Sequence, residues 1–158
     1  EPVSLSAEDA QLLETRKFQV IEIARALEWI YDTLAADVTL AGLVGTRIYD
    51  GVAPQGAAFP FLVFSHLGGS DTLGVGTFRA LNSGLFQVKA VTESQSYVSA
   101  TAIADRADEV LQGAAGSKNG ATIASCQREQ PLMQLEQNAG IEYRHVGGLY
   151  RLITHKEP

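Results

Sequence analysis

Apolar residues recur at helical spacing in the first quarter of the chain. They lie at every third or fourth position between residues 20 and 34, at Val20, Ile23, Ala24, Leu27, Ile30, Tyr31 and Leu34. This stripe predicts an amphipathic helix, and we expect the acids off the stripe, Glu22, Glu28 and Asp32, to face water. Before residue 18 the pattern loosens. Three arrangements remain open there: a separate helix, an arm, or one long helix for which Ser6 is a suitable cap.

A second apolar stripe follows two serines that can cap a helix, Ser94 and Ser96. We predict a helix that ends at Gly113 and whose many alanines let it approach a sheet closely. Its apolar positions are Tyr97, Ala100, Ile103, Ala104, Ala107, Val110 and Leu111.

Period-two patterns and short apolar runs predict strands around this helix. Residues 61–66 are mostly apolar, which indicates a strand covered on both faces, and residues 85–91 alternate. Two more strands are predicted at 121–127 and 141–154. Pro131 indicates an end or a bulge after the first of these, and Gly147-Gly148 indicates a bulge or a tight bend in the second. The predicted fold is a single α+β domain, with an antiparallel or mixed sheet and two main helices on one face.

Glycines gather between the first two of these strands, in the stretch Gly68-Gly69-Ser70-Asp71-Thr72-Leu73-Gly74-Val75-Gly76-Thr77-Phe78. A connection of this length in a compact domain is typical of a functional or mobile segment. We therefore predict a mobile glycine-rich loop whose apolar residues, Leu73, Val75 and Phe78, are covered by a neighbouring molecule.

Charge and cysteine content narrow the function classes. The net charge is −6, and residues 1–37 hold eight acids against three bases, so the chain lacks the positive surface of proteins that grip phosphates. Cys126 is the only cysteine, which rules out an intramolecular disulfide. No apolar run reaches the ~18 residues that indicate a membrane span, and no signal peptide is visible. We expect synthesis in the cytosol and no role at a membrane.

Residues that could carry enzyme chemistry are few. Three histidines, His66, His145 and His155, lack the spacing of a metal site, and His66 is best interpreted as a structural residue in or beside an apolar strand. Cys126 lies in a strand pattern without a basic neighbour, as in a buried, inert thiol. We predict no catalytic, cofactor-binding or metal-ligating residue, and no cofactor.

The stretch from Asp37 to Phe64 carries a family resemblance. A helical turn ends at Leu43-Val44-Gly45, a short strand follows at Arg47-Ile48-Tyr49, and a Pro/Gly loop leads to Phe59-Pro60-Phe61. This ordered run, followed by strands, one helix and two closing strands, resembles the tail completion (tail terminator) proteins of long-tailed bacteriophages. The match covers about residues 26–154. Residues 1–20 are interpreted as an extension, and residues 21–158 as the α+β domain of the family.

The resemblance implies a structural virion protein rather than an enzyme. Such proteins form hexameric rings that cap the tail tube in the host cytoplasm and join it to the head connector, while DNA passes the lumen without specific binding. The expected partners are therefore further copies of the chain, the tail tube protein and the connector. A head-closure or neck adaptor protein and, less well supported, a small enzyme remain alternatives.

Contacts with these partners are expected at three places: the glycine-rich loop Gly68 to Phe78, the loop Val52 to Phe59, and the edge of the closing strand. Trp29 is interpreted as an aromatic residue at the edge of the core or as an interface anchor, because tryptophan is enriched at contact hot spots. The candidate contact residues are Trp29, Val52, Pro54, Phe59, Gly69, Asp71, Leu73, Val75 and Phe78.

Overall fold

The computed structural model describes residues 6–76 and 79–157, without the side chains of residues 9–21. Its sheet has the strand order β1-β2-β3-β6-β5-β4. Strand β1 pairs parallel to β2, and the other pairs are antiparallel. The predicted α+β class with a mixed sheet is confirmed. The elements are α1 (Ala7–Ala35), α2 (Val38–Val44), β1 (Ile48–Asp50), β2 (Phe61–Leu73), β3 (Arg79–Glu93), α3 (Val98–Leu111), β4 (Gly116–Lys118), β5 (Ala121–Asn138) and β6 (Ile141–Lys156).

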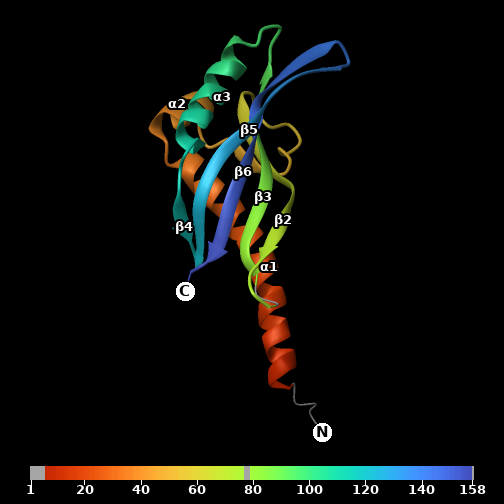
Figure 1. Ribbon diagram of the computed structural model, residues 1–158. Coiled ribbons are helices and arrows are strands. Elements are labelled where there is room, and N and C mark those ends of the chain that lie inside the picture. The colour runs from red at the N-terminus through yellow and green to blue at the C-terminus, as the bar shows by residue number, and fades with distance from the viewer. Residues whose placement is uncertain (1–5, 77–78, 158) are drawn as a thin grey trace.

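Two layers make up the domain, because α1 and α3 lie on the same face of the sheet (Figure 1). Side chains of both helices share one core cluster with alternate residues of the long strands. Its members include Ile30, Leu34, Ile103, Leu111, Leu62, Phe64, Phe86, Val88, Ile123 and Leu152. The predicted packing of two main helices on one face is confirmed, and α2 adds a third, short helix.

Helix α1 settles the question left open at the front of the chain. It is one unbroken helix that begins directly after Ser6, and its first half extends beyond the sheet (Figure 1). Ala26, Trp29, Ile30 and Leu34 are buried on it.

Two expectations for α1 are wrong: that Tyr31 lies on its buried stripe, and that Glu22 faces water. Tyr31 is exposed, and Glu22 is buried, with 1% of its surface accessible. The buried face of α1 is turned toward Ala26 and Trp29, because the helix also covers β4 at the far edge of the sheet. There the Trp29 ring lies against Gly116, where a Cβ would be 2.7 Å from the indole Nε1. This rotation of the contact face brings Glu22 onto the sheet.

Helix α2 ends at Gly45, as predicted, and begins at a side-chain cap, Asp37, that was not predicted. The Asp37 carboxylate accepts a hydrogen bond from the Leu40 backbone N–H at 2.8 Å, which caps the helix. The same carboxylate accepts from the Arg106 guanidinium of α3 at 2.6 and 3.1 Å. Gly45 ends α2 with a φ of 61°, a conformation that glycine adopts without strain. This corner therefore ties α2 to α3.

Strand β2 is covered on both faces, as predicted. Leu62 and Phe64 point into the core beneath the helices, whereas Phe61 and Val63 point to the opposite face and pack under the loop of residues 51–60. The apolar run of this strand therefore serves two separate clusters.

The predicted glycine-rich loop at residues 68–78 is wrong over most of its length. β2 continues to Leu73 and pairs with β3, so only a short turn remains. Gly69 lies within β2. Only glycine fits there, because a Cβ would lie 2.3 Å from the Ser83 carbonyl oxygen. Gly69 marks a close approach of two strands, whereas a Cβ on Gly68 would meet nothing within 4 Å.

The last two strands form one long hairpin, so the alternative in which the strand ends at Pro131 is wrong. β5 passes through Pro131 to Asn138, with register shifts at Ile123/Ser125 and Arg128/Gln130. Gly147 and Gly148 stay in register with β3, so the bulge expected at this pair is wrong for β6. A Cβ on Gly147 would lie 2.0 Å from the Val88 carbonyl oxygen. Here too, glycine allows a close strand contact, and the irregularity lies on the neighbouring β5.

Candidate contact surfaces

The face of the sheet opposite the helices carries an aromatic cluster built by the loop of residues 51–60. Phe59 lies 5.0 Å from Phe61 and 5.4 Å from Tyr143, and Tyr49 lies 5.7 Å from Phe61, measured between ring centroids. Ring separations of this size are typical of stabilising aromatic pairs. Phe59, a predicted contact residue, is therefore half-buried and anchored within its own chain.

Two other predicted contact residues line a shallow groove beside this loop. Val52, which is 80% exposed, and Pro54 face α1 and β1 across a groove of about 530 Å³. Tyr31 and Phe64 contribute apolar surface, and the acids at the groove are Glu28, Asp32 and Asp50. The Lys118 ammonium is 2.5 Å from the Asp32 carboxylate. An apolar floor with an acidic rim suits a protein surface rather than a phosphate.

The end of β2 and the turn after it hold four of the predicted residues, Gly69, Asp71, Leu73 and Val75. Asp71 pairs with Arg79 at 3.3 Å and accepts a hydrogen bond from the Asn82 amide at 2.9 Å. Beyond this polar anchor, Leu73 and Val75 are exposed. Gly69 lies just before it in the strand, and Phe78 lies outside the described residues.

Trp29 lies away from these surfaces. Only 7% of its area is exposed, and it belongs to the main core cluster of the chain. The structure therefore matches the interpretation of Trp29 as a core residue.

A further surface, the tip of the β5–β6 hairpin, contains residues that the sequence analysis did not name. Met133 and Leu135 are 64% and 49% exposed, and Ile141 is 41% exposed. Figure 1 shows that this hairpin extends past the rest of the sheet. The sequence did contain a signal for this exposed apolar surface. Met133 and Leu135 alternate with polar residues, and Glu136 is the single charged residue between Glu129 and Glu142.

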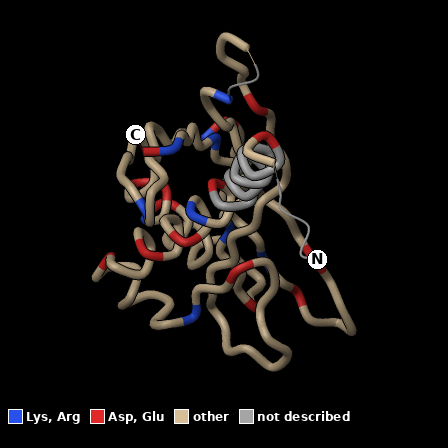
Figure 2. The backbone as a smooth tube through the Cα atoms, turned by 90° about the horizontal axis from the view of Figure 1, so that it is seen from below, with Lys and Arg blue, Asp and Glu red and all other residues tan. Residues whose placement is uncertain are grey.

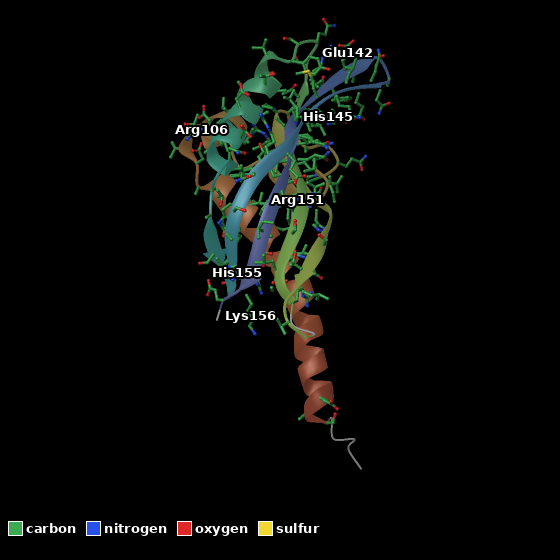
Figure 3. All side chains as sticks on the ribbon, in the orientation of Figure 1. Arg106, Glu142, His145, Arg151, His155 and Lys156 are labelled. Atoms are coloured by element: carbon green, nitrogen blue, oxygen red, sulfur yellow. The ribbon has the colours of Figure 1, made fainter. Side chains whose placement is uncertain are left out.

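Charged residues fasten the base of this hairpin to the domain. The Arg144 guanidinium lies 4.8 Å from the centre of the Tyr97 ring and donates to the Gln95 carbonyl oxygen at 3.0 Å and to Glu142 at 2.6 Å. His145, labelled in Figure 3, is buried. Its Nε2 atom lies 2.9 Å from the Glu136 carboxylate. Burial, and then Lys89, lower the pKa of His145, while Glu136 opposes them. His145 is therefore a neutral structural residue at neutral pH.

Of the residues considered for chemistry, His145 and Cys126 are buried, and His66 and His155 are partly buried. Cys126 is buried, as predicted, and burial, followed by Asp108, raises the pKa of its thiol to about 12, which disfavours the reactive thiolate. The Tyr150 hydroxyl donates to Asp108 at 2.8 Å, and burial, followed by this bond, raises the pKa of Tyr150. Among the side chains that the structure describes, no three His, Cys, Asp or Glu residues gather as a metal site would require.

Among the residues coloured in Figure 2, Lys and Arg are interspersed with Asp and Glu along the backbone in this view. In the described part of the chain, no helix has both the length and the apolar character needed to cross a membrane.

Comparison with known proteins assigns the chain to one family. The model of the family "Tail completion protein gp17" matches residues 28–146. A chain from the virion of a native gene transfer agent particle has the same fold, with a TM-score of 0.63 and 21% identity over 80% of this chain and 92% of that one. No curated protein matches. Because the family model spans well over half of the sequence, the chain belongs to the tail completion protein gp17 family and is a phage tail structural protein.

Proposed function

We propose that this protein ends the growth of the tail tube as a ring, of six copies by resemblance, and joins the tube to the head connector. The proposal rests mainly on the family match over residues 28–146. It is supported by apolar side chains that the domain leaves uncovered at two separate places. These are Leu73 and Val75 at the β2–β3 turn and Met133, Leu135 and Ile141 at the β5–β6 hairpin. Residues 1–20 would be an extension to the family domain.

The mechanism is mechanical. Tube rings stack through a heterologous interface that has no intrinsic end. Growth stops when a ring satisfies the last open interface on one side and offers a different surface on the other. The net charge of −6 suits a wall past which DNA moves, because a negative surface repels the duplex.

Electron microscopy of lysates without this gene tests the proposal. We expect tails that fail to stop at a uniform length and DNA-filled heads that stay unjoined. Re-expression of the chain is the control, and it should restore tails of normal length on heads. Normal-length tails joined to heads in its absence would refute the proposal. Free tails of normal length would instead favour the head-closure alternative.

A further inference from the structure

The hairpin tip of residues 130–141, called the arm here, has an unusual composition for a solvated segment. It carries one charged residue, Glu136, although charged residues make up 19% of the chain. Its exposed apolar residues, Met133, Leu135 and Ile141, have no cover within the described chain. Natural proteins protect exposed strand edges with lysine and other charges. The arm therefore has the composition of a protein contact.

The outer edge of β5 is open along the arm. β4 covers only Ala121–Ile123 of that edge. The Cys126 carbonyl and the Arg128 N–H are satisfied next, by the Gly113 N–H and the Gln112 side chain, each at 2.8 Å. Beyond Arg128, no described strand pairs with this edge. Pro131 cannot donate a hydrogen bond, but residues 132–138 contain no proline and can accept a further strand.

A second open edge lies on the opposite side of the same sheet. β1 pairs with β2 only from Leu62 to Phe64, so residues 65–73 of β2 have no described strand on that side. Leu67 and Leu73 on this segment are exposed. One chain thus presents two different open edges, each accompanied by uncovered leucines.

From this pairing of features we propose that the arm of one copy adds its β5 edge to the β2 edge, residues 65–73, of the next copy. The inference rests on the proposed ring. Strand addition forms main-chain hydrogen bonds along both edges, and the leucines beside them supply apolar contact. The two edges are different surfaces on opposite sides of the sheet, so the contact is heterologous and can close into a ring.

Other occupants fit the arm less well. The arm contains no Lys or Arg, which a nucleic acid or an anionic membrane surface would require. Pairing of two arms would be isologous and would stop at a dimer. A strand of the tail tube protein would fill the β5 edge but would leave the β2 edge of this chain open.

Site-directed cross-linking tests the contact. Leu135→Cys and Leu67→Cys place one thiol on each edge, and the buried Cys126 does not compete. A short bismaleimide is added to a mixture of the two single variants, after circular dichroism has shown that each is folded. We expect cross-linked dimers in the mixture and none in either variant alone. The double variant should give a ladder of higher oligomers.

Val38→Cys is the matched control, because Val38 is exposed on α2 and lies on neither edge. A mixture of Val38→Cys with Leu135→Cys should give no specific dimer. Cross-linking of Leu135→Cys to itself would overturn the proposal in favour of an arm–arm contact. So would the absence of the mixed dimer under conditions in which the protein forms rings.

Native mass measurement separates this inference from the proposed function. Closed rings without the mixed cross-link would refute the edge contact and leave the ring intact. The mixed cross-link with only open chains, and no closed ring at any concentration, would support the edge contact and count against the terminator ring.

Discussion

Glu22 gives the sharpest test of the packing between α1 and the sheet. Its side chain is buried, and its Oε2 atom has no hydrogen-bond partner among the described residues. Burial raises the pKa of Glu22 to about 7, against the opposing effect of Arg79; Asp71 raises it further and His155 lowers it. The folded protein therefore holds this proton more tightly than the unfolded chain does.

The sign of the pH dependence follows from that difference. Between pH 4.5, the ordinary pKa of the carboxyl, and about 7, the folded state binds more protons than the unfolded state. The free energy of unfolding should therefore fall as the pH rises through this window, and then level off. At 1.36 kcal/mol per pKa unit, the full contribution of Glu22 is on the order of 3 kcal/mol.

Glu22→Gln replaces the ionisable group with a neutral one of the same shape. The variant should match the wild type near pH 4.5 and be more stable at pH 8, by up to about 3 kcal/mol. Urea melts between pH 4.5 and 8 measure this difference, at a protein concentration low enough that assembly does not add to stability.

Glu28→Gln is the control on the same helix. Its carboxylate is on the surface, and the hydrogen bond from Arg25 lowers the pKa of Glu28, so this substitution should not stabilise the protein at pH 8. Equal stability of Glu22→Gln and wild type at pH 8 would show that Glu22 is solvated and that the contact face of α1 is misplaced.

Two further expectations follow from the core and from the charge. Leu34→Ala removes a fully buried side chain and should cost about 2–5 kcal/mol in denaturant melts. Val38→Ala changes an exposed position of α2 and should cost almost nothing, so equal losses would contradict the assigned core. The purified protein should not shift duplex DNA in a gel assay at physiological salt, because its net charge is −6. Tight, salt-sensitive binding would contradict the proposal that the ring forms a wall past which DNA moves.

The sequence predicted the fold well where apolar spacing is decisive. The core positions of α3 and the face of β3 that holds Phe86, Val88 and Ala90 lie where their periodicity places them. Gly45 ends α2, as predicted, through its backbone conformation, which depends on that residue alone. These features depend on contacts within one element or between its nearest neighbours.

The failures have a common physical cause. Gly69 and Gly147 resemble loop or bulge residues in a linear sequence, yet both are needed because another strand passes too close for a Cβ. Glu22 is buried because α1 turns toward β4, about a hundred residues further along the chain. Long-range approaches of this kind leave no periodic signal in the local sequence.

The contact residues also divide into those visible in the local sequence and those set by the distant strands that pack beside them. Exposure of Val52, Leu73 and Val75 could be anticipated from their turns, but the open edge of β5 depends on how far β4 extends beside it. A short β4 leaves the outer side of residues 130–138 of β5 without a described strand, and a short β1 does the same for the outer side of residues 65–73 of β2. Because both outer strands are three residues long, each edge of the sheet is closed near one end and open beyond it. Two different open edges on one chain are what a heterologous ring contact requires, so the brevity of β1 and β4 becomes the feature that would permit assembly.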